Sequence, residues 1–424
     1  MSANGNQAQQ SAISDSLTQL EATLGTSTDD SASPTALIGS LENALQTYAA
    51  APQNIAGAKA AVTAAQNPAE GLNSASATVQ NVREQADTSI ASSVNTINSI
   101  LSQFQQVNDT IVNSPPGSDI TDLQDQRDTL LQQLSGQIGI TTVTRANNDV
   151  AIFTDSGVTL FDKTPRSVTF TPTASFSAST QGNAVYADGV PITAPGSSMS
   201  IHTGALAGLV QVRDNLAVTY QTQLDEIARG LIADFQDTDQ SATPTQPAQA
   251  GLFTNGGSLN VPAAGVAVPG LASTIQVAAS VDPTTGNPEL LRDGGISSNG
   301  AAPYVYNPVP GQAGYTDRLN QLITNLSQSL TFDASASAGT QTSVTIYAAS
   351  SASWLGTQVS QASTAASYST AVQNTSSTAL SNSTGVNLDN EMSKMLELEQ
   401  SYQASAKLLT SINALYTSLF AAIQ

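Results

Sequence analysis

The 424-residue chain contains no cysteine, one histidine (His202) and one tryptophan (Trp354). Without cysteine it has no disulfide, no thiolate zinc site, no iron–sulfur cluster and no thiol nucleophile. A single histidine excludes a histidine-rich metal site. Charge is also scarce, because charged residues make up 10% of the chain, against roughly 25% in an ordinary soluble domain. These absences exclude most metal- and thiol-based chemistry.

Positive charge is the scarcest kind. Lys and Arg number 12 and Asp and Glu 32, so the net charge is −20. Nucleic acids and anionic membranes both require clustered Lys and Arg, so neither is an expected partner. No run of about 18 apolar residues occurs, which argues against membrane insertion. The chain opens without the basic and then apolar segments of a signal peptide, so none is expected to be cleaved.

Few residues suggest catalysis. We predict that the protein is not an enzyme and binds neither a cofactor nor a metal ion. His202 lies between a predicted strand and a predicted helix, without a Gly-x-Ser-x-Gly motif, and is expected at the surface or a boundary. The acids of 234–240 lack the glycine and glutamate of a calcium loop and are expected at a solvated helix end. Asp225 and Glu226 are expected to face solvent. The sequence does not exclude a pair of carboxylates of the kind that glycosidases use.

Helical periodicity dominates the first 135 or so residues. Apolar side chains recur every three or four residues in 13–24 and 37–48, and most persistently from about Pro68 to Val112. Helical patterns return at 204–237, at 317–330 and at about 343–381. The segment 141–162 instead has β-branched runs separated by turn residues, and Asp188-Gly189 is expected at a hairpin turn.

These patterns predict a mainly α protein with a β insert. We expect an elongated antiparallel helical bundle or coiled coil, a small β-rich region and an extended amphipathic C-terminal helix. The predicted parts are a helical bundle at 1–140, a β-rich insert at 141–203, a long helix at 204–240, an irregular outer region at 241–312, more bundle at 313–384 and a C-terminal polymerisation helix at 385–424.

The last helix carries the most informative pattern. From Leu388 to the C-terminus, positions alternate by four and three residues, which is a 3.5-residue repeat. These positions are Leu388, Met392, Met395, Glu399, Tyr402, Ala406, Leu409, Asn413, Tyr416, Phe420 and Ile423. A second apolar row consists of Leu398, Leu408, Ile412, Leu415 and Leu419. Such a helix must pack internally, stay disordered or be covered by neighbours. An alternative interpretation is that it is an ordinary core helix of a helical bundle.

Several segments resemble flagellar proteins, with 204–236 and 275–291 in support of two more specific ones. The C-terminal segment resembles the terminus shared by flagellar rod, hook and hook-associated proteins, with a start at Gly385, Val386, Asn387, Leu388 and Asp389 and a centre at Gln400, Tyr402, Ala404 and Ala406. The sequence around Asp125, Gln126, Arg127 and Asp128, followed by a predicted β-meander, resembles the flagellar hook-associated protein 1 family, the hook–filament junction proteins.

This resemblance implies a structural subunit that joins the flagellar hook to the filament through packing of helices between subunits. The partners would be further copies in a ring, the hook protein, the adjacent hook-associated or filament protein, and an export chaperone on the C-terminal helix. The protein would be secreted to the flagellum by the type III pathway. The expected interface residues are Leu388, Met392, Met395, Tyr402, Ala406, Leu409, Tyr416, Phe420 and Ile423.

The start of the chain differs from the family pattern. Relatives open with a helical segment containing an Asn-Ile-Ala-Asn-like motif, which is not found here. The expectation is a truncated chain, a misassigned start or a lost segment. Two alternatives remain: another axial protein, such as a flagellin-like or second junction protein, or an enzyme or adhesin carried on an appendage.

Overall fold

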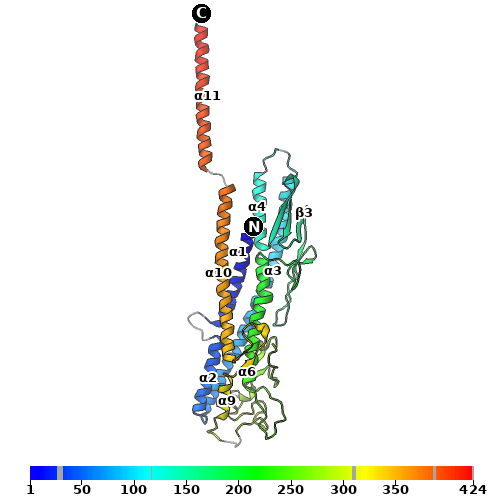
Figure 1. Cartoon of the computed structure of the whole chain (residues 1–424), viewed down its shortest axis with the longest axis vertical. Coiled ribbons are helices and arrows are strands. Elements are labelled where there is room, and N and C mark those ends of the chain that lie inside the picture. The colour runs from blue at the N-terminus through cyan, green and yellow to red at the C-terminus, as the bar shows by residue number, and fades with distance from the viewer. Residues whose placement is uncertain (26–31, 116, 308–311, 385–387, 423–424) are drawn as a thin grey trace. The chain divides into compact units, whose positions relative to one another are not determined.

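The computed structural model describes residues 1–25, 32–115, 117–307, 312–384 and 388–422. These residues form two compact units, which we call the main unit (Met1–Ser369) and the C-terminal unit (Thr370–Gln424). The main unit is mainly helical with small antiparallel sheets, as the sequence predicts (Figure 1). The six-part division of the chain stays a prediction.

Helices make up most of the main unit. Its first four helices are α1 (Ser2–Glu21), α2 (Pro34–Ala50), α3 (Ile55–Val112) and α4 (Thr121–Gln137). Further along follow α5 (Ala205–Gln211), a π-helical turn (Val212–Leu216), α6 (Ala217–Asp234), α7 (Leu271–Thr274), α8 (Leu290–Asp293) and α9 (Asp317–Asn325). Helix α10 (Val344–Thr384) begins in this unit and ends in the C-terminal unit, which also contains α11 (Leu388–Ala422).

Local signals explain where these helices begin. The Ser33 side chain accepts a hydrogen bond from the N–H of Ala36 at 3.2 Å, and Pro34 occupies the first helical position of α2. The Asn54 side chain likewise accepts from the N–H of Ala56 at 3.0 Å at the start of α3. Because only Ala51–Asn54 separate α2 from α3, the two helices form a hairpin and pack together.

Helix α3 is 58 residues long and begins at Ile55, so the expectation of a start near Pro68 was wrong. Pro68 lies inside the helix, where it lacks an N–H for the usual bond. A buried stripe of small side chains, including Ala58, Val62 and Ala65, continues the packing face ahead of the proline. Tertiary packing of this stripe therefore outweighs the local cost of the proline.

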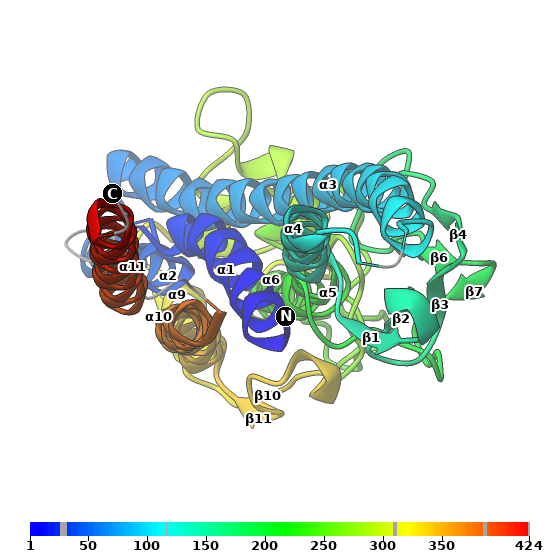
Figure 2. The ribbon, with the colours of Figure 1, turned by 90° about the horizontal axis from the view of Figure 1, so that it is seen from above.

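The β region lies beside the C-terminal part of α3 (Figure 2). Its main sheet has the order β1-β2-β3-β4, all antiparallel, and a second sheet has the order β5-β6-β7. The strands are β1 (Ile140–Thr144), β2 (Val150–Thr154), β3 (Thr159–Asp162), β4 (Thr164–Pro165), β5 (Val168–Thr169), β6 (Tyr186–Ala187) and β7 (Val190–Pro191). Asp188 and Gly189 both have positive φ between β6 and β7, which confirms the predicted hairpin turn.

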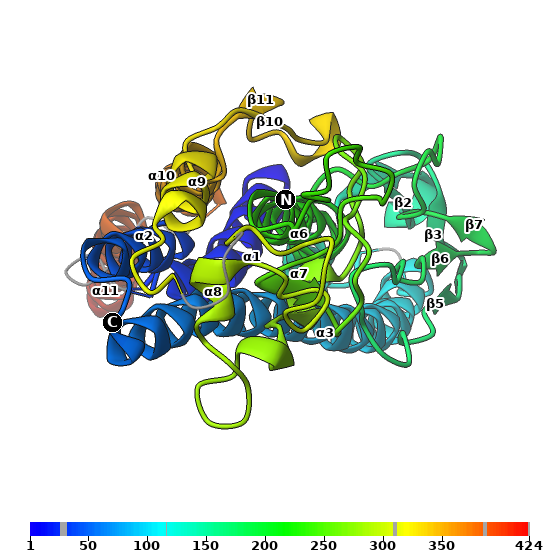
Figure 3. The same ribbon diagram turned by 90° about the horizontal axis from the view of Figure 1, so that it is seen from below.

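The segment between α6 and α10 is mostly irregular. It contains two small antiparallel pairs: β8 (Phe253–Asn255) with β9 (Ile275–Val277), and β10 (Leu330–Thr331) with β11 (Gln341–Thr342). Figure 3 shows that the short helices α7, α8 and α9 of this segment lie near α2 and α6. Helix α9 ends at Asn325, so the expectation of a helix to Leu330 was wrong, because Leu330 enters a strand.

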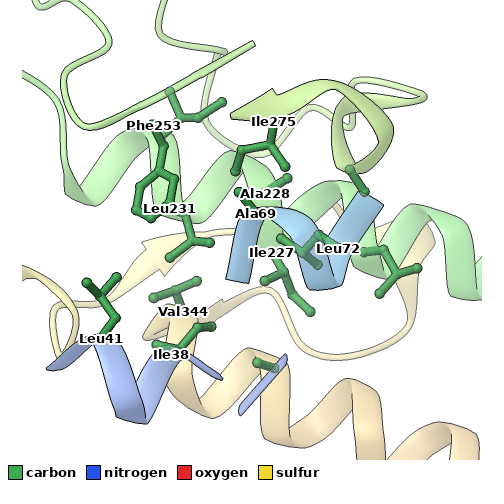
Figure 4. Packing of buried hydrophobic residues seen from close by; sticks show 14 of the residues in the cluster. Ile38, Leu41, Ala69, Leu72, Ile227, Ala228, Leu231, Phe253, Ile275 and Val344 are labelled. Atoms are coloured by element: carbon green, nitrogen blue, oxygen red, sulfur yellow. The ribbon is translucent and has the colours of Figure 1, made fainter. Parts of the chain in front are cut away.

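The main unit has two hydrophobic cores. One core joins α2, α6, α10 and the first half of α3, and its buried side chains include Ile38, Leu72, Leu231 and Val344 (Figure 4). The other joins the second half of α3 to α4, α5 and the β region, with Phe104 and Phe161 in an edge-to-face contact 5.0 Å apart. The long helix α3 therefore connects the two cores.

Candidate interaction surface on the C-terminal helix

Helix α11 exposes large apolar side chains along its described length. Met395 is 71% exposed, Tyr402 79% and Phe420 67%. The other predicted interface residues that the structure describes are also exposed: Met392, Ala406, Leu409 and Tyr416. The side chains of Leu388 and Ile423 lie outside the described residues. Within the C-terminal unit no described residue is buried, so this unit does not cover its own apolar surface.

The second apolar row of α11 is equally uncovered. Leu398 is 69% exposed and Leu415 70%. Leu408, Ile412 and Leu419 are exposed as well. Full burial of one such side chain is worth roughly 1.5–3 kcal/mol, so a partner that covers both rows would gain a large free energy. Exposed apolar patches of this kind mark sites of association.

Charge is distributed unevenly along α11. Asp389, Glu391, Glu397 and Glu399 lie in its first third, together with Lys394. From Leu408 to Ala422 the helix carries no charged residue. The second part of α11 can therefore be surrounded on several sides without burying a charge, whereas the first part keeps charged side chains that require water or a polar partner.

Of the four residues of the family motif on α4, Arg127 is the one that packs inside the main unit. Arg127 is buried, and its Nη1 donates to the carbonyl oxygen of Asn148 at 2.6 Å, which ties α4 to the turn between β1 and β2. Burial lowers the pKa of Arg127. Asp125, Gln126 and Asp128 are exposed. Of the second motif, Asp389 is exposed at the start of α11, and Gly385, Val386 and Asn387 lie outside the described residues.

The acids that were expected to face solvent are buried instead, so that expectation was wrong. Asp225 accepts hydrogen bonds from the N–H groups of Gly270 and Ala272 at 2.9 and 2.8 Å, which anchors α7. Glu226 pairs with Arg229 through two hydrogen bonds of 2.9 Å. The predicted solvated helix end is also wrong, because Asp234, Asp237 and Asp239 are all buried.

Sequence reasoning also missed a buried ionic network. Arg213 in the π-helical turn pairs with Asp87 of α3 at 2.6 Å and with Asp214 at 2.7 Å. Arg83 donates to the carbonyl oxygens of Arg213 and Ser177, at 2.9 and 2.8 Å. The network holds the irregular chain near residue 177 against α3. The available signal was the position of Arg213 on the apolar face of its helix.

Other features yield little chemistry. The side chain of His202 is 73% exposed, at the surface as expected, with Nδ1 3.9 Å from Asp155 Oδ1. Among the described residues, no three histidine or acidic side chains are grouped to hold a metal ion. In the same part of the chain, every helix is too short or too polar to pass through a lipid bilayer.

The described chain therefore consists of a helical main unit and a C-terminal helix with two uncovered apolar rows, which is the composition of a helical structural protein. Comparison with known families agrees with this class. Residues 17–251 match the family described as the flagellar hook-associated protein FlgK helical domain. Because this match spans more than half of the chain, the protein belongs to that family.

Residues 377–420 match a second family, the flagellar basal body rod FlgEFG protein C-terminal. This match coincides with α11 and the end of α10. Among solved structures, the chain is similar to the flagellar hook junction protein FlgK from Burkholderia pseudomallei, at 22% identity and a TM-score of 0.47. The similarity covers 60% of this chain and 46% of that one, so this chain spans less than half of that protein. None of the curated proteins matches the sequence.

Proposed function

We propose that this protein is a structural subunit of the bacterial flagellum that joins the hook to the filament. It acts through packing of helices between subunits and not as an enzyme. The observation that carries the proposal is the uncovered apolar surface of α11, with Met395, Tyr402, Leu409, Tyr416 and Phe420 between 58% and 79% exposed. The matches to two flagellar families support it, one of them along α11 itself.

The proposed partners are those that the family resemblance implies, and the uncovered apolar rows of α11 support them. Further copies in a ring, the hook protein and the adjacent hook-associated or filament protein would cover the apolar rows in the assembled flagellum. Copies arranged about an axis make heterologous contacts, in which one surface of a subunit meets a different surface of the next. Two separate apolar rows on one helix suit such contacts, because each row can meet a different neighbour.

Before assembly the same rows would need another cover. An export chaperone that binds α11 would shield its apolar side chains and keep the helix from aggregating. The protein would then leave the cell through the flagellar type III pathway without a cleaved signal peptide and act outside the cell. The absence of cysteine is compatible with this route, because no disulfide has to be reduced before the chain is unfolded.

Deletion of residues 385–424 tests the proposal. In a strain that lacks the wild-type copy, we expect the truncated protein to keep the fold of the main unit and to fail to attach filaments to hooks. Circular dichroism and thermal unfolding of the purified protein check the fold, and electron microscopy and swimming assays check attachment. Normal swimming with this deletion would contradict the proposal.

Point substitutions separate the apolar rows from the helix as a whole. Leu409→Glu and Tyr416→Glu place a charge in the first row and should prevent attachment, because a charge would have to be buried without a partner. Ser411→Glu and Ser418→Glu place the same charge on exposed residues outside the two rows and serve as matched controls. The proposal predicts filament attachment with the control variants.

A further inference from the structure

The two hydrophobic cores of the main unit form separate clusters, although the same helices contribute to both. We call the cluster that contains Leu72 and Leu231 the α6 core, and the cluster that contains Phe104 and Phe161 the β core. Helix α3 supplies apolar side chains to both cores, and so does the helical path that runs from α5 through the π-helical turn into α6. The place where these helices pass from one core to the other is therefore a boundary inside the main unit.

The boundary occupies about one helical turn of each helix. In α3, Val82 is the last buried member of the α6 core and Ala86 is the first of the β core. In the returning path, Leu209 of α5 is the last buried member of the β core and Val212 is the first of the α6 core. The two crossings are adjacent in space, because α3 packs against both α5 and the π-helical turn.

Charged side chains fill this boundary. Arg83 and Asp87 of α3 and Arg213 of the π-helical turn are all buried there, and we call them, with Asp214, the charged layer. Arg213 pairs with Asp87 at 2.6 Å, and Nε of Arg83 donates to the carbonyl oxygen of Arg213 at 2.9 Å. Ion pairs are strong where water is excluded and weak where it is not. The layer therefore holds the two helices together only while it stays dry.

The π-helical turn changes the buried face of the helix at the same place. Val212 and Ala217 are both fully buried in the α6 core, although they lie five residues apart. In a regular α-helix five residues turn by roughly 500°, so the two side chains would point about 140° apart. The wider π-helical turn brings them back to one side. Such turns occur frequently at functional sites.

An irregular segment between β5 and β6 lies over the charged layer, and we call residues 170–183 the strap. Asp87 accepts hydrogen bonds from the N–H and the hydroxyl of Thr173 at 2.8 and 3.1 Å. Arg213 donates to the carbonyl oxygen of Asn183 at 2.9 Å. The charged layer therefore fastens both ends of the strap.

The middle of the strap is held by Arg83. Its Nη1 donates to the carbonyl oxygen of Ser177 at 2.8 Å, its Nη2 donates to that of Thr180, and its Cζ lies 4.8 Å from the centre of the Phe176 ring. None of residues 170–183 is buried. The strap is therefore held by polar and ring contacts to the charged layer and not by burial in either core.

We propose that the strap is a seal that couples the two cores. While it is in place, the charged layer stays dry, the ion pairs hold α3 to the π-helical turn, and both cores unfold together. When it lifts, water reaches the charges and weakens the pairs, and the β core opens while the α6 core stays folded. The β core is the one that opens, because the strap connects two of its strands and contributes no residue to the α6 core. This inference concerns the main unit and does not depend on the proposed function.

Gly182→Val tests the seal without removing a charge. A Cβ at this position would overlap Cζ and Nε of Arg213, and because Asp87 and Asp214 hold that guanidinium, the strap should move away. In hydrogen-exchange mass spectrometry of the full-length protein, peptides from β1 to β3 should exchange faster than in the wild type by roughly tenfold or more, and peptides from α2 and α9 should stay within about twofold. Gly314→Val is the matched control, since its Cβ would meet no atom within 4 Å.

Thr173→Val is a milder second variant, which keeps the test available if Gly182→Val does not fold. It removes the hydroxyl that donates to Asp87 and accepts from the N–H of Asn183. The same peptides from β1 to β3 should exchange faster than in the wild type, by a smaller factor than in Gly182→Val. Thr173→Ser keeps the hydroxyl and should exchange as the wild type does.

Trp354 provides an independent measurement of the α6 core. It is the only tryptophan of the chain and packs against that core. In urea unfolding, the midpoint of Trp354 fluorescence should stay near the wild-type value in both strap variants. Peptides of the β core should lose protection at a lower urea concentration than this midpoint. In the wild type the two events should coincide.

Each other outcome would overturn the proposal. Faster exchange confined to residues 170–183 would make the strap a local feature without influence on the β core. Equal loss of protection in both cores would show that they stay coupled without the seal, and unchanged exchange in both strap variants would show that the strap does not keep the layer dry. A wild-type protein whose two cores lose protection at different urea concentrations would show that nothing couples them.

Discussion

At the scale of single residues, Asp234 lies in an environment far from that of an unfolded chain. It lies at the end of α6, is 3% exposed, and its Oδ2 has no hydrogen-bond partner. Burial raises the pKa of this carboxyl group to about 8, although the nearby positive charge of Arg229 opposes the change. Asp225, which is also buried but hydrogen-bonded, has its pKa raised to about 6, again by burial. Both acids therefore make the stability of the main unit depend on pH.

The direction of this dependence follows from linkage. The pKa of Asp234 is about 8 in the folded protein and about 3.9 in an unfolded chain. The folded state thus holds this proton more tightly, and the contribution of Asp234 to stability falls as the pH rises from about 4 to about 8. Asp225 acts in the same direction between about pH 4 and its folded pKa of about 6.

Asp234→Asn should remove most of the stability that the protein loses as the pH rises. We expect the variant to be more stable than the wild type at pH 9 by about 1–3 kcal/mol, because no carboxylate then has to ionise without a partner. Near pH 5 the two proteins should have similar stability. Urea unfolding at pH 5, 7 and 9 measures the difference, and Asp15→Asn on the exposed face of α1 is the control. A wild-type protein that becomes more stable between pH 5 and 9 would contradict this account.

Arg213 is the second residue with a large predicted effect. Burial lowers its pKa, but hydrogen bonds and charges from Asp214 and Asp87 outweigh burial and raise it. Arg213→Met would leave the buried Asp87 without its cation and should destabilise the protein by about 3–5 kcal/mol. Chemical denaturation measures this change. Arg145→Met is the matched control, because Arg145 is exposed and its removal should have little effect; equal effects of both variants would show that the buried network is unimportant.

At the scale of elements, α1 and α5 approach each other through a glycine. A side chain at Gly208 of α5 would place its Cβ 2.5 Å from the carbonyl oxygen of Gln9 in α1. The obstacle is backbone, which cannot rotate away as a flexible side chain would. The N–H of Gly204, just before α5, also donates to the carbonyl oxygen of Gly5 at 3.0 Å. The contact therefore depends on the backbones of both helices.

Gly208→Ala should destabilise the main unit by about 1–3 kcal/mol through this overlap, even though alanine favours a helix over glycine. Gly39→Ala in α2 is the matched control, since its Cβ would meet no atom within 4 Å. The control should stabilise the protein by about 0.5–1 kcal/mol through helix propensity alone. Thermal unfolding compares both with the wild type, and stabilisation by Gly208→Ala would refute the close approach.

The secondary-structure elements also show how much of the fold sequence periodicity can predict. The spacing of Ile13, Leu17 and Leu20 predicted α1, and β-branched runs separated by turn residues predicted β1 to β3. The start of α3 could not be predicted, because Pro68 locally favours a helix start and only packing of the alanine stripe keeps the helix continuous. The burial of Asp225 and Glu226 was equally hidden, since it depends on distant elements: α7, where the N–H of Ala272 donates to Asp225, and the segment after α9, where the N–H of Asp333 donates to Glu226.

At the scale of the whole molecule, charge and apolar surface oppose each other. The net charge of −20 repels copies from one another, whereas the apolar rows of α11 favour association. Salt screens the repulsion, because the Debye length falls from about 30 Å at 0.01 M to about 3 Å at 1 M. Association through α11 should therefore be stronger at high salt.

Sedimentation velocity of the purified protein tests this balance. We expect a larger average mass in about 1 M salt than in about 0.01 M salt, and no change for the protein that lacks residues 385–424. Equal masses of the full-length protein in both conditions would show that repulsion between copies does not limit its association. Salt-dependent association of the truncated protein would locate the contact outside α11.

The sequence by itself determined the helical class, the β-meander, the flagellar resemblance and the two apolar rows of the last helix, because each depends on the spacing of nearby residues. Only the tertiary structure decided where α3 begins, which carboxylates are buried and which arginines neutralise them. Those features depend on residues far apart in the chain, such as Asp87 and Arg213, and no local period records which of them will meet. Desolvation, which gives Asp234 its high pKa, likewise exists only once the surrounding elements have packed.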